Sequence, residues 1–297
     1  MRVAVAMVFS AMILPASDFQ IDHVTVAGND IRKLQAGLAS IGIPSVYGGA
    51  HLNNTTEMAL ASLADGAYLE LMALRQNADP HLAGQHVWAR FLKGDAGPCA
   101  WALREKDLPA EVRRLKAAGI QVSEPVASGR QRPDGVRLDW QTSNIGEGVR
   151  GAFFPFLIHD LTARDLRAFP QGKPPGGDFR GISRVVIGVR DLDAAIARYR
   201  RAYALPEPVR ETDPSFGARL ATFAGTPVVL AQPLGADSWL SLRLARFGES
   251  PCAFVLAAAR PESYHAQSRS SWFGVEISWF DTETLGWHLG FEKAMQP

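Results

Sequence analysis

The sequence predicts an α+β protein built from four copies of one strand–helix–strand–strand–strand unit. Residues 21–26 and 182–187 are matching β-rich runs, and each is followed by an Asp-Ile or Asp-Leu pair that opens a helical pattern. Residues 97–101 and 250–254 match in the same way, in the same order and at nearly the same spacing. The second half of the chain is therefore expected to copy the first.

Each half divides again into two units. Apolar residues at helical spacing follow Asp30 and Asp107, and both patterns end near a glycine, Gly42 or Gly119. Aspartate suits the N-cap of a helix, and glycine suits the left-handed residue after its last turn. Beyond each helix lie two or three β-rich runs separated by turn residues. In the fourth unit the expected helix, over 261–270, is polar and poorly periodic.

A run rich in proline and glycine separates the halves and is typical of a linker. The expected division is an N-terminal extension over 1–19, a first domain over 20–169 that carries the site, a linker over 170–180 and a second, degenerate domain over 181–297.

Composition excludes several classes of protein. Of 297 residues, 47% are apolar and 21% are charged, which is typical of globular domains and not of disordered or fibrous chains. The 31 basic and 30 acidic residues nearly cancel, so no nucleic-acid partner is expected. Two cysteines, Cys99 and Cys252, exclude a disulfide scaffold and a cysteine-rich zinc site. Both follow a proline in apolar surroundings and are interpreted as small core residues.

The first 17 residues contain one arginine, an apolar run and then small residues, a pattern that resembles a short signal peptide without a clear cleavage site. The alternative interpretation is a packed N-terminal extension, or a start at Met7 or Met12. The predicted location is the cytoplasm, with export as the alternative. No segment is apolar enough to cross a membrane, so no membrane partner is expected.

Residues 21–24 (Ile-Asp-His-Val), 48–51 (Gly-Gly-Ala-His) and 66–71 (Gly-Ala-Tyr-Leu-Glu-Leu) resemble the vicinal oxygen chelate superfamily, in particular its glyoxalase-like branch. The resemblance implies that paired units form curved, cup-shaped mixed sheets with helices on their outer faces. It also implies a divalent metal in many members. Those members include glyoxalases, ring-cleaving dioxygenases, epimerases and metal-free binding proteins, so the reaction class stays open.

Glu70 and His23 are the candidate catalytic and metal-binding residues. Strand alternation places Tyr68, Glu70 and Met72 on one face of an otherwise apolar strand. A buried carboxylate is costly unless it is paired, hydrogen-bonded or bound to a metal. The resemblance implies that His23 and Glu70 point into one cup, where they suit Fe, Mn, Ni, Co or Zn. A plain buried ion pair, or a glutamate at an exposed edge, is the alternative.

Further metal ligands are not evident in the sequence. Alignment of the second unit on the first carries His23 onto Ala100 and Glu70 onto Pro155, neither of which can coordinate. His51, in a glycine-rich turn, and His159, at the end of a strand, are the substitutes considered. A lone loop histidine is more often simply exposed.

The second half carries Arg184 in place of His23 and Val229 in place of Glu70. Arg184 is a candidate for binding a substrate carboxylate, because its guanidinium forms a bidentate fork. His288 is interpreted as a core histidine. The remaining candidate substrate-binding residues are Tyr68, Trp101, Phe154 and His159.

Two hypotheses follow for function. The first is an enzyme of the lyase, isomerase or ring-cleaving dioxygenase type, which acts on a small organic molecule with a divalent metal and no organic cofactor. In it, Glu70 acts as a metal ligand or, if substrate displaces it, as a general base. The second is a metal-free protein that sequesters an aromatic or hydrophobic compound. A homodimer is possible in either case.

Overall fold

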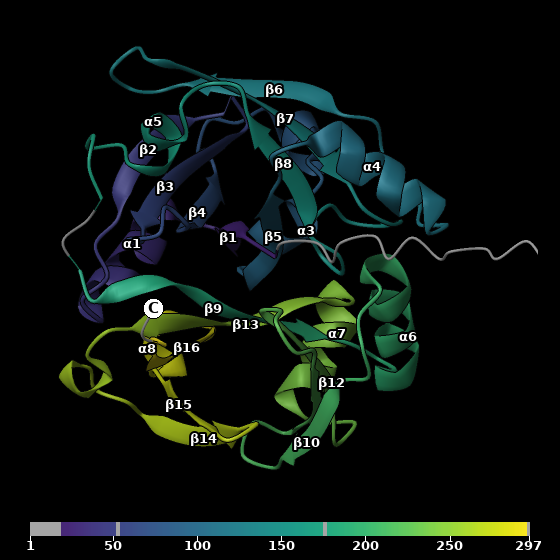
Figure 1. Ribbon diagram of the computed structural model, residues 1–297. Coiled ribbons are helices and arrows are strands. Elements are labelled where there is room, and N and C mark those ends of the chain that lie inside the picture. The colour runs from purple at the N-terminus through teal and green to yellow at the C-terminus, as the bar shows by residue number, and fades with distance from the viewer. Residues whose placement is uncertain (1–18, 52–53, 175–176, 296–297) are drawn as a thin grey trace, which may run out of the picture.

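The computed structural model describes residues 19–51, 54–174 and 177–295. These residues form two eight-stranded mixed sheets, each curled into a nearly closed cup, and the cups are stacked with their outer faces together (Figure 1). The strand orders are β2-β3-β4-β1-β5-β8-β7-β6 and β10-β11-β12-β9-β13-β16-β15-β14, which are the same order repeated. The α+β fold, the internal repeat and the cup-shaped sheets predicted from the sequence are confirmed.

Two units build the first sheet, and both run strand, helix, three strands. The first contains β1 (Ile21–Gly28), α1 (Ile31–Ser40), β2 (Val46–Ala50), β3 (Thr56–Ser62) and β4 (Tyr68–Leu74). The second contains β5 (Gly97–Arg104), α4 (Leu108–Ala117), β6 (Val126–Gln131), β7 (Arg137–Asn144) and β8 (Phe156–Asp160). Three short helices lie outside this pattern: α2 (Pro80–Gln85) and α3 (Ala89–Lys93) between the units, and α5 (Arg164–Ala168) after β8.

The second sheet repeats the plan. Its units are β9 (Phe179–Gly188), α6 (Leu192–Tyr203), β10 (Val209–Asp213), β11 (Ala218–Thr222) and β12 (Val228–Pro233), then β13 (Ser250–Ala258), η1 (Pro261–Ser263), β14 (Ser268–Trp272), β15 (Val275–Trp279) and β16 (His288–Lys293). Helix α7 (Trp239–Phe247) joins the units, and α8 (Thr282–Leu285) precedes β16.

The helix boundaries follow the predicted capping chemistry. Asp30, Asp107 and Asp191 each accept hydrogen bonds from backbone N–H groups in the first turn of α1, α4 and α6. These aspartates therefore fix where each helix starts after the first strand of its unit. The fourth unit differs from the prediction. Its expected helix is a three-residue 3₁₀ turn, because the stretch that begins at Pro261 has no apolar face to bury against the sheet.

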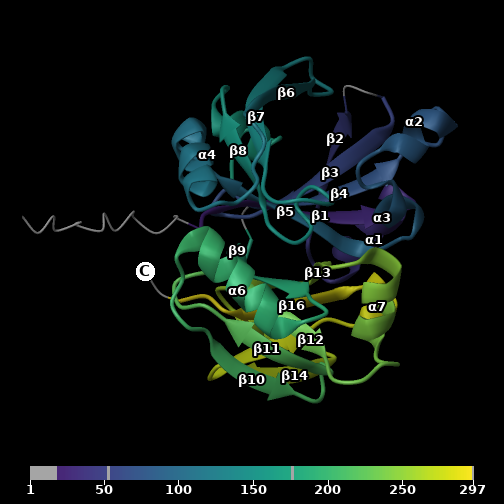
Figure 2. The same ribbon diagram turned by 90° about the vertical axis from the view of Figure 1, so that its right-hand side faces the viewer.

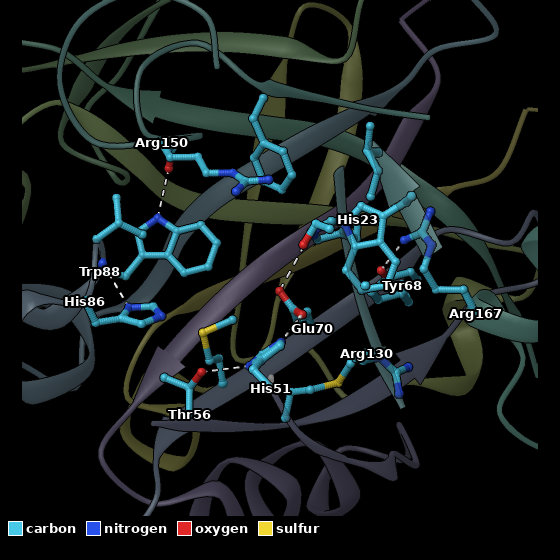
Figure 3. A pocket seen from close by; sticks show the side chains of 18 residues that line it. His23, His51, Thr56, Tyr68, Glu70, His86, Trp88, Arg130, Arg150 and Arg167 are labelled. Carbon is cyan, nitrogen blue, oxygen red and sulfur yellow. Dashed lines mark hydrogen bonds and ion pairs between the residues drawn. The ribbon is translucent and has the colours of Figure 1, made fainter. Parts of the chain in front are cut away.

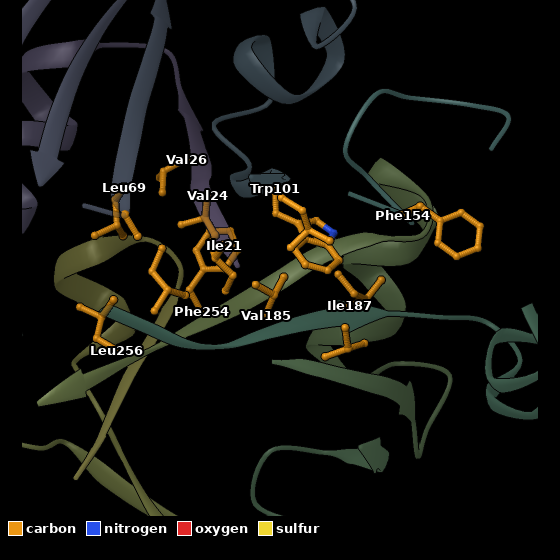
Figure 4. Packing of buried hydrophobic residues seen from close by; sticks show 14 of the residues in the cluster. Ile21, Val24, Val26, Leu69, Trp101, Phe154, Val185, Ile187, Phe254 and Leu256 are labelled. Atoms are coloured by element: carbon orange, nitrogen blue, oxygen red, sulfur yellow. The ribbon is translucent and has the colours of Figure 1, made fainter. Parts of the chain in front are cut away.

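The outer faces of the two sheets share one hydrophobic core. Strands β1 and β5 of the first sheet lie against β9 and β13 of the second (Figures 1 and 4). Val24, Trp101, Val185 and Phe254 are all fully buried there. Helices α1, α4 and α6 add their apolar faces to the same core (Figure 2). The inner faces of the cups are thereby left free to line cavities or to fill them.

Two close contacts fix how the sheets meet. Gly97, at the start of β5, has φ +67, and a Cβ there would lie 2.4 Å from the Cβ of Trp287. Glycine is therefore required by both the backbone and the space. Arg243 on α7 donates to the carbonyls of Ala96, at 2.5 Å, and of Pro251, at 2.7 Å. One side chain thus joins backbone segments of both sheets.

The predicted domain limits of 20–169 and 181–297 stay a prediction. Strand β9 begins at Phe179, so the last two residues of the expected linker belong to the second sheet. The proposed signal segment lies outside the described residues, apart from its extension to residue 19. Among the described residues, no helix is both long enough and apolar enough to cross a membrane.

Aromatic side chains fill the second cup. Phe216 packs against Trp272 and Trp279, with ring centroids 4.9 and 5.2 Å apart. His288 stacks on Trp239 at 4.0 Å, and burial, helped by the positive charge of Arg243, lowers its pKa to about 4. The interpretation of His288 as a core residue agrees with this packing.

We expect Phe254→Ala to lower the free energy of unfolding by about 3–5 kcal/mol. The substitution leaves a cavity between two packed sheets, and neither sheet can move far enough to fill it. Leu242→Ala is the matched control, since Leu242 is 63% exposed. Urea titration of both variants measures the difference. A loss for Phe254→Ala no larger than that of the control would contradict a shared core.

Because the pKa of His288 is lowered in the folded state, its contribution to stability is complete above the unfolded pKa near 6.5. Below pH 6.5 the His288 side chain is protonated in the unfolded chain but stays neutral in the folded chain. The free energy of unfolding therefore falls between about pH 6.5 and pH 4. Unfolding titrations across this range should show a smaller decline for His288→Gln than for the wild type. Equal declines would contradict the assignment.

Candidate functional site

The first cup holds a cavity of about 300 Å³ between its inner face and the α2–α3 segment. Its wall combines ionisable side chains with aromatic rings (Figure 3). The ionisable residues are His23, Glu70, His51, His86, Arg130, Arg150 and Arg167. Tyr68, Glu70 and Met72 all line it, while Leu69 and Leu71 enter the core, so the predicted alternation of β4 is confirmed.

Two imidazoles converge on Glu70. His23 Nε2 lies 3.7 Å from Glu70 Oε2, and His51 Nε2 lies 3.7 Å from Glu70 Oε1. The parallel register sets Glu70 opposite Thr25, whose hydroxyl donates to Glu70 Oε2 at 3.1 Å. His51 follows β2 and reaches over the cup (Figure 3). The structure thus brings together the three residues named as metal candidates.

The Nδ1 atom of each imidazole lies within hydrogen-bond distance of a buried side chain. His23 Nδ1 lies 2.6 Å from Asp22 Oδ1, and His51 Nδ1 lies 2.7 Å from Thr56 Oγ1. Since Asp22 is ionised, we assign the Nδ1 proton of His23 to this bond. Its Nε2 then presents a lone pair to the cavity. This arrangement is the one by which proteins orient a histidine toward a metal or a proton.

Glu70 is only 7% exposed, yet it is ionised. Burial alone raises its pKa, but His51, His23 and the Thr25 hydroxyl outweigh burial and hold the pKa at about 2. A carboxylate with so low a pKa is suited to binding a cation and is a weak base at neutral pH.

A network of buried charged residues holds the His23 side chain in position. Asp22 has no exposed surface, and Arg167 holds it through two hydrogen bonds, of 2.9 and 2.7 Å. Arg164 donates to the same carboxylate, and Arg167 also bonds Asp160 at 2.6 Å. Burial raises the pKa of Asp22, but the charge of Arg167 and the bond to His23 outweigh it, so the pKa lies well below its usual range.

The other predicted substrate-binding residues do not line this cavity. Trp101 and Phe154 lie in the core between the sheets, because Trp101 alternates with the cup-facing Ala100 and Ala102, and Phe154 packs on Tyr199. His159 points away from the cup, and its Nδ1 lies 2.8 Å from the Glu105 carbonyl.

Arg184 belongs to the second sheet and forms an ion pair with Glu292 at 2.9 Å, so it is not free to bind a substrate carboxylate in the first cup. Val229 pairs with Val186 as Glu70 pairs with Thr25, which places it at the predicted equivalent position.

One alignment in the second unit is off by one residue. In the first unit Thr25 pairs with Glu70, and the residue at the position of Thr25 in the second unit is Ala102. Ala102 pairs with Phe156, so the equivalent of Glu70 is Phe156 and not Pro155. The ring of Phe156 packs edge-on against His23 at 5.3 Å. The second unit therefore supplies apolar surface where a ligand was sought.

As the side chains stand, no group of three or more His, Cys, Asp or Glu in the described part of the chain could hold a metal ion. The chemistry of the donor set nevertheless fits one. The lone pair of His23 Nε2 faces an anionic oxygen at 3.7 Å, too far for a hydrogen bond, so a positive charge between them is favourable. A proton on the ring or a divalent ion satisfies this requirement.

Several wall residues were missed by sequence reasoning, namely Thr56, His86, Trp88, Arg130, Trp140, Arg150 and Arg167. Thr56 begins β3, and the others lie on β6, β7, α5 and loops, where no periodic pattern marks the side that faces the cup. Asp22 had a signal, since it is a second ionisable residue inside an apolar strand.

A family model described as a glyoxalase-like domain matches residues 21–203. The chain belongs to this glyoxalase-like family. The match includes β1, β4 and the whole first cup, and the predicted resemblance to the vicinal oxygen chelate superfamily is thereby confirmed. No curated protein gives a significant match.

Solved structures share the fold of this glyoxalase-like chain. A hypothetical protein from Staphylococcus aureus matches 92% of this chain and 99% of its own, with a TM-score of 0.64 and 15% identity. A mutant of 4-hydroxymandelate synthase from Streptomyces coelicolor matches 95% and 94%, with a TM-score of 0.59 and 12% identity. Similarity at this level of identity establishes the fold alone.

We expect Asp22→Asn to destabilise the protein by about 3–5 kcal/mol, because it removes the fully buried anion that Arg167 and Arg164 share and leaves Arg167 with Asp160 alone. Asp193→Asn removes an exposed ion pair and should cost less than about 1 kcal/mol. Chemical denaturation compares them. If both variants lose the same small amount, the network does not stabilise the fold.

Proposed function

We propose that the first cup is the active site of an enzyme that acts on a small organic molecule, with Glu70 between His23 and His51 as its centre. The observation that carries this proposal is the convergence of an ionised carboxylate and two oriented imidazoles on the wall of a cavity of about 300 Å³. Burial of three such groups is unfavourable unless they serve one another or a ligand.

A divalent ion such as Fe, Mn, Ni, Co or Zn would be held by His23, His51 and Glu70. When bound, such an ion supplies a Lewis acid that polarises a carbonyl or vicinal oxygens of the substrate. The contacts of Glu70 support a role as ligand over a role as general base, because the Thr25 hydroxyl and the two imidazoles stabilise its ionised form.

The surrounding residues of the chain have roles that follow from their contacts. Arg167 donates to the Tyr68 hydroxyl at 2.6 Å, so the phenol proton is free to bond an oxygen of a molecule in the cavity. Burial raises the pKa of Tyr68 above its usual range, which keeps that proton in place. Trp88 and Phe156 exclude water from the same space.

The reaction belongs to the lyase, isomerase or ring-cleaving dioxygenase type in this proposal. The alternative is a metal-free protein that sequesters an aromatic or hydrophobic compound. One observation favours that alternative: the second unit contributes Ala100 and Phe156 where it would otherwise supply ligands.

The test is the metal content of protein purified without an affinity tag and reconstituted with divalent ions. We expect close to one ion per chain in the wild type and in His159→Ala, whose side chain lies outside the cavity. The double variant His23→Ala, Glu70→Ala should bind none at that site. A wild type that takes up no ion would contradict the metal-dependent enzyme and favour the metal-free alternative.

A further inference from the structure

Two arginines on the wall of the first cup have no carboxylate partner in the described part of the chain. The third, Arg167, is neutralised by Asp22 and Asp160. Arg130 is buried and Arg150 is half-buried, and neither forms an ion pair among the described residues. A buried guanidinium without an anion is unfavourable, so its presence in a cavity needs a reason.

Arg150 lies in the loop between β7 and β8, and its guanidinium carbon is 4.1 Å from the centre of the Phe156 ring. Its Nε is buried and has no hydrogen-bond partner. Burial lowers the pKa of Arg150 to about 10, with Glu70 acting in the opposite sense, so the group stays charged at neutral pH. The backbone carbonyl of Arg150 accepts from Trp88 Nε1 at 2.9 Å, which anchors the loop to the cavity wall.

The Arg130 guanidinium on β6 uses one of its NH₂ groups in a hydrogen bond to the backbone, while the other has no hydrogen-bond partner. Its Nη1 donates to the Gly48 carbonyl at 2.9 Å, which links the two edge strands of the cup. Its Nη2 is buried and without a partner. Figure 3 shows Arg130 on the opposite side of Glu70 from Arg150.

The charges on the wall do not balance. Among the described residues, two guanidinium groups without a carboxylate partner face the single carboxylate of Glu70, which already contacts His23 and His51. The remaining surface is largely aromatic or thioether, from Trp88, Trp140, Phe156, Tyr68, Met58 and Met72. A ligand that complements both features carries a negative charge on an aromatic or otherwise flat apolar body.

We propose that the first cup is specific for aromatic carboxylates, with the carboxylate bound by Arg150, Arg130 as the second positive charge, and the ring held among Trp88, Trp140 and Phe156. This inference rests on the proposed function for the site and adds the class of molecule that enters it.

The probes are benzoate and 2-naphthoate, each paired with its uncharged amide, and binding is followed by calorimetry and by the fluorescence of the cavity tryptophans. We expect each carboxylate to bind at least about tenfold more tightly than its amide, as charge-assisted hydrogen bonds imply. Arg150→Gln should remove this preference and leave amide affinity unchanged, while Arg150→Lys should retain part of it. Arg269→Gln, at an exposed position of the second sheet, is the matched control.

Equal affinity for acids and amides, no acid binding at millimolar concentration, or a preference that survives Arg150→Gln would each overturn the inference. Circular dichroism checks that the variants fold. If Arg150→Gln does not fold, the comparison of Arg150→Lys with the wild type still tests the proposal. The variant Glu70→Gln separates the proposed metal-dependent enzyme from the proposed specificity for aromatic carboxylates. It should abolish metal uptake but strengthen the binding of the carboxylates, since it removes the one negative charge on the described wall of the cavity. Acid binding without metal uptake would therefore contradict the enzyme proposal alone.

Discussion

The buried carboxylate of Asp22 is the constraint on which the functional cup depends. An isolated charge with no exposed surface would be intolerable, and Arg167 and Arg164 compensate it from a short helix that follows the last strand of the first sheet. This pairing holds α5 against β1. It also fixes the tautomer and direction of His23, so the same interaction that stabilises the fold prepares the site.

The two cups show how one fold can be specialised by its inner face. Their strand orders are identical, and the same central strands form the shared core. In the first cup, ionisable residues surround a cavity, whereas in the second Phe216, Trp272 and Trp279 fill the corresponding face. The second sheet therefore contributes to stability by covering the outer face of the first, and the function proposed for the chain belongs to the first half.

Local signals in the sequence predicted most of the fold. Aspartate caps and the strand period located the helices and assigned the faces of β4, and with them Glu70 and His23. The aromatic candidates Trp101 and Phe154 lie in the core instead: an apolar residue such as Trp101 fits either face of a strand that is buried on both sides, and Phe154 lies in the turn before β8. The shift from Pro155 to Phe156 arose because glycine motifs do not fix register. The roles of Arg150 and Arg130 were not predicted, since they depend on contacts between residues distant in sequence.

The most direct test of the account is an anomalous difference map from crystals soaked in Co²⁺, recorded at the cobalt edge. We expect one strong peak bounded by Glu70, His23 and His51, and its loss in Glu70→Gln crystals treated identically. An ordered first cup with no cobalt among these residues would contradict the claim that they form a functional centre for a divalent ion.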